Sequence, residues 1–255
     1  MANILFNKDW HFNMLGIYNI NKTGSFSNLL DFIKNNHQKI DGDIIEAGVY
    51  RGSSLLAIAK LLKDLGSDKK VYGFDTFSGF PPIYNQKDDI SEFQNLFKDG
   101  LLSKDHLESV ILNQSLLDSF TNKDAKSIES ISSSEEFDST NISTIEKKID
   151  YLELDNIHLI KGKFSETMQE EQGIKKLMCG VIDCDLYESY LESLAFIWPK
   201  LSEGGFIHLD EYYSLKFPGA RRAVQEFIKG RNDLVLKEKS EIQDFERWFL
   251  IKKSL

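Results

Sequence analysis

Strand-like and helix-like segments alternate along most of this 255-residue chain. Short apolar runs typical of buried strands separate longer segments whose apolar residues recur every three or four positions, as on one face of a helix. This alternation predicts an α/β fold with a mostly parallel sheet. The expected strands are residues 43–47, 71–75, 157–160, 177–182, 206–209, 234–237 and 248–252. The expected helices are 26–36, 53–65, 143–154, 188–201 and one from Pro218 to just before Gly230.

Local end signals refine this outline. Gly66 is expected to end the helix over 53–65, and Ser143 with Glu146 forms a capping-box pattern at the start of the helix over 143–154. Residues before Phe26 look irregular. We therefore expect an N-terminal segment with one helix at 1–40, followed by one domain at 41–255.

A polar, serine-rich and acidic insertion interrupts the pattern at about 83–142. Helical stretches are expected near 91–98 and 104–118, whereas 121–142 looks flexible. Long insertions in compact domains are commonly functional lids or disordered segments. We expect a lid over the site with a disordered part.

Composition excludes several classes of function. The net charge of −9 argues against a nucleic-acid partner, which needs clustered Lys and Arg. No run of 18 apolar residues is present, so no membrane span is expected, and the first residues lack the pattern of a secretory signal. Cys179 and Cys184 are expected to be core thiols, in keeping with a cytoplasmic location.

A glycine-containing turn joins the first strand to the second helix. Gly48 and Gly52 permit a tight turn and close approach of a ligand, and the helix N-terminus offers free N–H groups. The segment is neither GxGxxG nor a phosphate loop. Because Glu46 precedes the first glycine, the turn favours a cationic ligand over a pyrophosphate, although a turn without any ligand remains an alternative.

Asp75 ends the second strand, one strand–helix unit after that turn. A carboxylate there can accept hydrogen bonds from two ribose hydroxyls, as in NAD or S-adenosylmethionine. The alternative is a cap or turn residue. Together, the turn and Asp75 indicate an adenosine-containing ligand.

Carboxylates gather after two later strands, at Asp183, Asp185, Asp210 and Glu211. Carboxyl ends of parallel strands are where open α/β sheets bind ligands. Four carboxylates in one cleft repel unless a cation, a shared proton or a basic partner compensates. Oxygen ligands without a Cys or His cluster suggest Mg²⁺, Ca²⁺ or Mn²⁺, which could bind two adjacent substrate hydroxyls. Strand-end acids can also serve only as caps and surface charge.

Five blocks carry a more specific resemblance. They are Glu46-Ala-Gly48-Val-Tyr-Arg51-Gly52, Asp75-Thr-Phe-Ser-Gly79-Phe-Pro, Lys161-Gly162-Lys-Phe164-Ser-Glu-Thr167, Asp183-Cys-Asp185-Leu-Tyr187-Glu-Ser189 and Asp210-Glu211-Tyr212. In this order, over residues 40–252, the chain resembles the macrocin O-methyltransferase family, which includes sugar O-methyltransferases of macrolide and aminocoumarin biosynthesis.

The resemblance implies a Rossmann-like class I methyltransferase fold with a seven-stranded sheet, S-adenosylmethionine as methyl donor, Mg²⁺, and a sugar hydroxyl or other vicinal diol as acceptor. It also suggests a dimer or larger homo-oligomer, which no residue here decides. By position, the resemblance implies that the methionine end of the cofactor is bound by Glu46, Gly48, Arg51, Gly52 and Ser53, the ribose by Asp75, and the adenine by the segment that contains Lys161, Gly162 and Phe164. It implies that Asp183 contacts both the cofactor and the metal and that Asp210 is a metal ligand. Asp185 would be the general base.

Glu211 stands where the family usually has aspartate, and its extra methylene moves the carboxylate of this expected metal ligand. His208 is expected to be a buried, hydrogen-bonded residue on the same strand face as Asp210. Tyr187, Tyr190, Tyr212 and Tyr213 are better explained as half-buried packing residues than as an acceptor pocket. A nicotinamide-dependent oxidoreductase and a non-catalytic nucleotide-binding protein remain as alternative functions.

Overall fold

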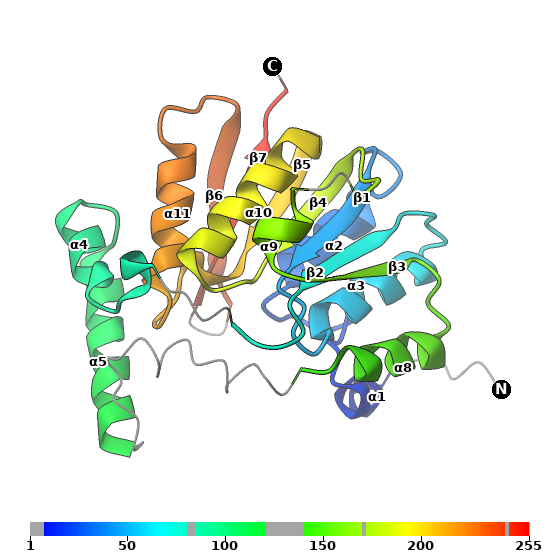
Figure 1. Cartoon of the computed structure of the whole chain (residues 1–255), viewed down its shortest axis with the longest axis horizontal. Helices are drawn as coiled ribbons and strands as arrows, with labels where there is room; N and C mark the ends of the chain where they lie inside the picture. The colour runs from blue at the N-terminus through cyan, green and yellow to red at the C-terminus, as the bar shows by residue number, and fades with distance from the viewer. Residues whose placement is uncertain (1–7, 81–84, 121–139, 170–171, 243–244, 255) are drawn as a thin grey trace.

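The computed structural model describes residues 8–80, 85–120, 140–169, 172–242 and 245–254 (Figure 1). Its centre is a seven-stranded sheet in the order β3-β2-β1-β4-β5-β7-β6. The strands are β1 Asp43–Ala47, β2 Val71–Asp75, β3 Ile157–Lys161, β4 Leu177–Ile182, β5 Leu201–Leu209, β6 Leu234–Ile242 and β7 Phe245–Lys252.

The first five strands pair in parallel, whereas β7 pairs antiparallel with both β5 and β6. The predicted α/β class, with seven strands in a mostly parallel sheet, is therefore confirmed. The central strands are buried on both faces, so they are nearly continuous apolar runs. Because the chain moves outward from β1 to β3 and then returns to β4 on the other side of β1, the strand order reverses next to β1.

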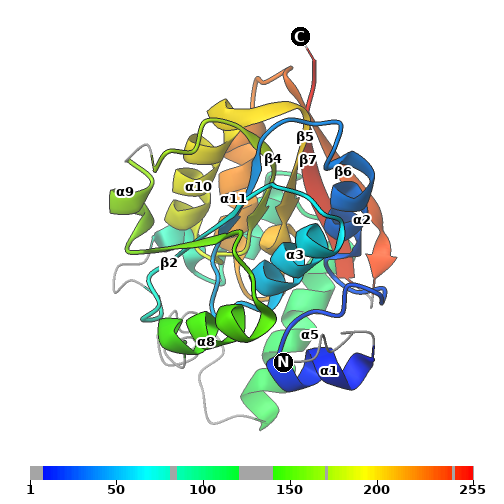
Figure 2. The same ribbon diagram turned by 90° about the vertical axis from the view of Figure 1, so that its right-hand side faces the viewer.

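Helices cover both faces of the sheet, as Figure 2 shows edge-on. One face carries α9 Phe164–Thr167, α10 Tyr187–Lys200 and α11 Pro218–Ile228; the other carries α1 Asp9–Leu15, α2 Ser27–Asn36, α3 Ser53–Asp64 and α8 Ile142–Leu152. Alternate strand residues supply the two cores. Ile45 packs with the α10 side and Ile44 with the α3 side, as the period of two along a strand requires.

The insertion contributes a lobe beside α11, at the left of Figure 1. It contains the 3-10 turn η1 Gln86–Asp88, α4 Glu92–Lys98 and α5 Lys104–Phe120, close to the predicted helical stretches. Phe93, Leu96 and Val110 form a small core there, against Leu215 and Phe217 of the main domain. Most of the stretch that looked flexible, residues 121–139, lies outside the described residues.

Several predicted boundaries were wrong. The residue that caps α8 is Asn141, whose side chain accepts a hydrogen bond from the backbone of Ser143, so the predicted Ser143–Glu146 capping box does not form. Strand β5 begins at Leu201, which had been assigned to the preceding helix, and β6 and β7 are longer than predicted because they pair as a hairpin. Helices α1 and α9 were not anticipated.

Within the described part of the chain, no helix has the length and apolar character needed to cross a membrane.

Candidate active site

The candidate site lies at the carboxyl ends of the parallel strands. The segments that follow β1, β2 and β4 meet there, together with η2 (Asp210–Tyr212) after β5. This is the edge where the strand order reverses, at which open α/β sheets leave a crevice between diverging loops.

The turn after β1 depends on Gly48. Its φ is 93°, and a Cβ added there would lie 1.7 Å from the carbonyl oxygen of Asp183. A side chain at this position is therefore excluded for two reasons: the positive φ disfavours it, and it would collide with the Asp183 carbonyl oxygen. Gly52, with φ 78°, then precedes α3 as its N-cap. The turn thus packs directly on the segment that follows β4.

Asp75 holds the same turn from the β2 side. Its Oδ2 accepts hydrogen bonds from the backbone N–H groups of Val49 (2.8 Å) and Tyr50 (2.9 Å). Its Oδ1 accepts one from Phe77 N (2.6 Å). The carboxylate therefore performs the turn role that the sequence left open, while it also lines the cavity described next.

A cavity of about 490 Å³ opens between these turns. The predicted site residues that line it are Gly48, Arg51, Ser53, Asp75, Phe164, Asp183 and Asp185. Glu46, Gly52, Lys161 and Gly162 do not line it. Glu46 accepts a hydrogen bond from the lining residue Ser54, Gly52 lies between the lining residues Arg51 and Ser53, and Gly162 N donates to the carbonyl oxygen of Asp75 (3.0 Å). Lining residues to which the sequence assigned no role include Tyr18, Thr140, Ser165, Glu188, Ser189 and Glu192.

Glu46 is fully buried beside this cavity. Ser54, which lines the cavity, donates a hydrogen bond to Glu46 Oε1, whereas Oε2 has no hydrogen-bond partner among the described residues. Burial raises the pKa of Glu46 well above its ordinary value, and the neighbouring carboxylates Asp183 and Asp75 raise it further. A buried carboxyl group of this kind gains from a nearby cation.

The predicted metal residues do come together. Asp183, Asp210 and Glu211 each offer one carboxylate oxygen, and these oxygens all lie within 4.8 Å of one another. Burial raises the pKa of Asp183 to about 7, and the charge of Asp210 adds to this shift. Burial and Asp183 likewise raise the pKa of Glu211. Without a cation, the ionised forms of Asp183 and Glu211 are therefore disfavoured in this cluster.

The pKa of Asp210, unlike those of Asp183 and Glu211, is lowered by two neighbouring side chains. Burial alone would raise its pKa, but His208 and Arg247 outweigh burial and lower it. His208 Nε2 lies 3.3 Å and Arg247 Nη1 3.4 Å from Asp210 Oδ1. The expectation of a buried, hydrogen-bonded His208 is confirmed, and Asp210 is its partner. The ring also packs on Phe26, with centroids 4.7 Å apart.

Glu211 is held from α10. The Tyr190 hydroxyl donates to Glu211 Oε2 (2.6 Å) and accepts from Glu211 N (3.1 Å). The extra methylene of glutamate therefore does not remove this carboxylate from the cluster. Tyr190 and Tyr212 are packing residues, as the sequence favoured, but they are fully buried and not half-buried.

A second cavity, of about 460 Å³, adjoins the acid cluster. Tyr213, Phe217, Phe245 and Arg247 line it together with Asp183, Asp185, Asp210, Glu211 and Ser214. Asp183 and Asp185 line both cavities. Asp185 adopts φ 63°, a conformation that non-glycine residues rarely adopt outside functional sites and tight turns.

The sequence of the chain is similar to those of known O-methyltransferases. The macrocin O-methyltransferase (TylF) family model matches residues 12–123 and 118–243. The mycinamicin III 3''-O-methyltransferase of Micromonospora griseorubida is 25% identical over 191 residues, which are 74% of this chain and 61% of that protein. The demethyldecarbamoylnovobiocin O-methyltransferase of Streptomyces niveus is 25% identical over 222 residues, 86% of this chain and 70% of that protein.

A third relative, a tetracenomycin-rhamnoside 4'-O-methyltransferase of Streptomyces olivaceus, is 24% identical over 75% of this chain and 59% of its own length. The chain thus spans about 60% of the length of two of these three relatives.

Solved structures share the fold. The O-methyltransferase NovP superposes with a TM-score of 0.62 at 19% identity, over 90% of this chain and 78% of that one. The calicheamicin methyltransferase CalS11 gives the same TM-score and identity over 97% and 81%. Since the family model covers most of the residues, the chain belongs to the macrocin O-methyltransferase family.

Proposed function

We propose that this protein transfers a methyl group from S-adenosylmethionine to a hydroxyl of a sugar or other vicinal diol, with the help of Mg²⁺. The observation that carries the proposal is the pair of adjoining cavities. One is lined by the glycine turn, the other by the acid cluster, and Asp183 and Asp185 belong to both. A donor and an acceptor can therefore meet across two carboxylates.

The first cavity fits the methyl donor. Gly48 and Asp75 both line this cavity, and Asp75 presents a carboxylate there, where a ribose could be bound. The methionine end of the donor carries an ammonium group. The buried Glu46, with one oxygen lacking a partner among the described residues, would be stabilised in its ionised form by that cation.

The acid cluster fits a hard divalent cation. Asp183, Asp210 and Glu211 provide only oxygen ligands, as Mg²⁺ prefers, and their mutual repulsion makes a cation favourable. Bound Mg²⁺ would orient two acceptor hydroxyls and lower the pKa of one. Tyr190 and His208 keep Glu211 and Asp210 in place for this role.

Asp185 is the residue we propose as general base. It lines both cavities, so its carboxylate can take the proton of an acceptor hydroxyl while that oxygen attacks the methyl carbon. The carbon–sulfur bond of the sulfonium breaks, its electron pair stays on sulfur, and S-adenosylhomocysteine leaves. Tyr213, Phe217 and Phe245 would enclose the acceptor.

Methyl transfer from radiolabelled S-adenosylmethionine to a panel of sugars, nucleotide sugars and glycosides tests the proposal. We expect transfer that EDTA abolishes and Mg²⁺ restores. Asp185→Asn should lower kcat by about 10²-fold or more while S-adenosylhomocysteine binding is retained, since general-base catalysis contributes about 10²–10⁴-fold.

The matched control is Asp155→Asn, an exposed carboxylate before β3, which should keep wild-type kcat. Undiminished turnover in Asp185→Asn would remove its role as base. Turnover that persists unchanged in EDTA would remove the metal from the mechanism.

A further inference from the structure

Helix α10 begins two residues after Asp185, and its first N–H group is capped from a distant part of the chain. The N-cap residue Leu186 makes no side-chain capping bond. Instead, Asp88 Oδ1, from η1 in the insertion, accepts a hydrogen bond from Tyr187 N at 2.8 Å. Asp88 is 4% exposed. A carboxylate that satisfies a free N–H group of a first turn stabilises the helix start.

Asp88 is tightly enclosed at this place. Its Oδ2 accepts from Asn85 N (3.3 Å), which closes η1 around the carboxylate. A Cβ at Gly219, in the first turn of α11, would lie 1.9 Å from Asp88 Oδ1, so only glycine permits this approach. Burial raises the pKa of Asp88 to about 6, which still leaves the group mainly ionised at neutral pH. The carboxylate thus sits between the starts of α10 and α11.

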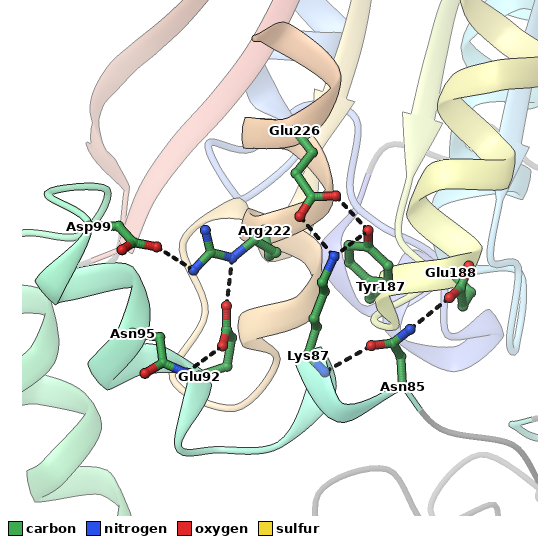
Figure 3. A network of polar contacts seen from close by, with 9 residues as sticks. All are labelled: Asn85, Lys87, Glu92, Asn95, Asp99, Tyr187, Glu188, Arg222 and Glu226. Atoms are coloured by element: carbon green, nitrogen blue, oxygen red, sulfur yellow. Dashed lines mark hydrogen bonds and ion pairs between the residues drawn. The ribbon is translucent and has the colours of Figure 1, made fainter.

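A polar network attaches the surrounding segment to both helices (Figure 3). Lys87 Nζ donates to the Tyr187 hydroxyl (2.7 Å) and to Glu226 Oε1 (2.8 Å). Asn85 Nδ2 donates to Glu188 Oε1 (2.7 Å), and Glu188 lines the first cavity. These contacts hold η1 against α10. Because Asp88 belongs to η1, its position depends on how the insertion packs on this helix.

We propose that Asp88 is a positioning residue, by which the insertion fixes the start of α10 and so places the Asp185 carboxylate between the two cavities. The inference rests on the proposed function in that Asp185 is the general base. Asp185 adopts a left-handed φ of 63°, so its backbone conformation needs support from the residues that follow. The bond from Asp88 to Tyr187 N supplies that support two residues away.

Three variants separate this role from general stabilisation. Asp88→Ala removes both acceptor oxygens, whereas Asp88→Asn keeps one oxygen for Tyr187 N in nearly the same volume and gives up only the longer bond from Asn85 N. Lys87→Met removes the neighbouring contacts with Tyr187 and Glu226 and leaves the capping bond.

We expect Asp88→Ala to lower kcat about ten- to hundredfold, because small misplacement of a reacting group has effects of this size. The KM for S-adenosylmethionine should change much less. Asp88→Asn and Lys87→Met should stay within about threefold of wild type in kcat.

Amide hydrogen exchange at Tyr187 gives a readout that needs no acceptor. Asp88→Ala should accelerate exchange there, and Asp88→Asn should restore the protection. The proposal is overturned if Tyr187 exchange is unchanged in Asp88→Ala, if Asp88→Ala keeps wild-type kcat, or if Asp88→Asn loses as much kcat as Asp88→Ala. If Asp88→Ala does not fold, a large loss of kcat in folded Asp88→Asn overturns it as well.

If the proposed function itself is wrong, the experiments give a different result from the one expected if only the role of Asp88 is wrong. The wild-type protein would then show no methyl transfer, and the exchange measurement would still decide whether Asp88 caps α10.

Discussion

At the residue scale, Glu46 is a fully buried carboxyl group with a raised pKa, beside the cavity proposed to hold the methyl donor. Its place before Gly48 had predicted a cationic ligand next to it. That Ser54 would donate to Glu46 could not be foreseen, because the pairing depends on how the turn of Gly48 places α3 against β1. For Asp75, the sequence left a ribose contact and a turn role open, and the three backbone bonds show the turn role.

Replacing Glu46 with Gln tests its proposed part in cofactor binding. The variant loses the negative charge but keeps an oxygen for Ser54. We expect the Kd for S-adenosylhomocysteine to rise roughly ten- to hundredfold, the equivalent of about 1.5–3 kcal/mol for a hydrogen bond to a charged group. Glu203→Gln, at an exposed position in β5, is the control and should bind as wild type does. Unchanged affinity in Glu46→Gln would contradict the assignment.

His106 offers a pH-dependent prediction outside the acid cluster. Its Nε2 donates to Ser214 O (2.7 Å), and its Nδ1 accepts from Arg221 Nη1 (3.4 Å). Burial lowers the pKa of His106 to about 4, from an ordinary value of 6.5, and the Arg221 charge also disfavours the protonated ring. The neutral ring therefore stabilises the fold above pH 6.5, and this contribution is lost as the pH falls toward 4.

We expect the free energy of unfolding of wild type to fall by roughly 3 kcal/mol more than that of His106→Gln over this pH range, as the size of the shift implies. Urea denaturation at several pH values measures the difference. Parallel pH curves for the two proteins would show that His106 does not titrate in this way.

At the scale of elements, strands and helices with strong periodicity were predicted well, and their ends were not. Helix α3 and strands β1, β2 and β4 match expectation because burial on one or both faces determines their pattern. The start of α8 was misplaced by the Ser143–Glu146 pattern, since Asn141 is an equally good cap and lies closer to Ile142. The hairpin of β6 and β7 extends through polar residues that cross-strand pairing, not periodicity, holds in the sheet.

Gly48 tests how the turn after β1 is built. Gly48→Ala should lower the free energy of unfolding by roughly 3 kcal/mol or more, because an unfavourable φ and contact with the Asp183 carbonyl act together. Gly66→Ala is the matched control, with φ 63° and nothing within 4 Å of an added Cβ, and should cost about 1 kcal/mol. Equal losses in the two variants would show that contact with Asp183 is not what requires glycine.

At the scale of the whole molecule, the α/β class, the seven strands and the gathering of acids at one sheet edge followed from the sequence. Parallel strands bring their carboxyl ends to the same edge, so Asp75, Asp183 and Asp210 had to lie near one another. The outer parts of the site could not be predicted in this way. Tyr18 comes from the N-terminal segment and Phe245 from the last hairpin. The spacing of apolar residues along the chain does not predict that either of them lines a cavity.

The most direct test of the central claim is a calorimetric titration of the wild-type protein with S-adenosylhomocysteine, with NADH titrated in parallel. The account predicts saturable binding of one S-adenosylhomocysteine per chain and none of NADH. Absence of S-adenosylhomocysteine binding, or preferential binding of NADH, would contradict the assignment of the cavity beside Gly48 and Asp75 to a methyl donor.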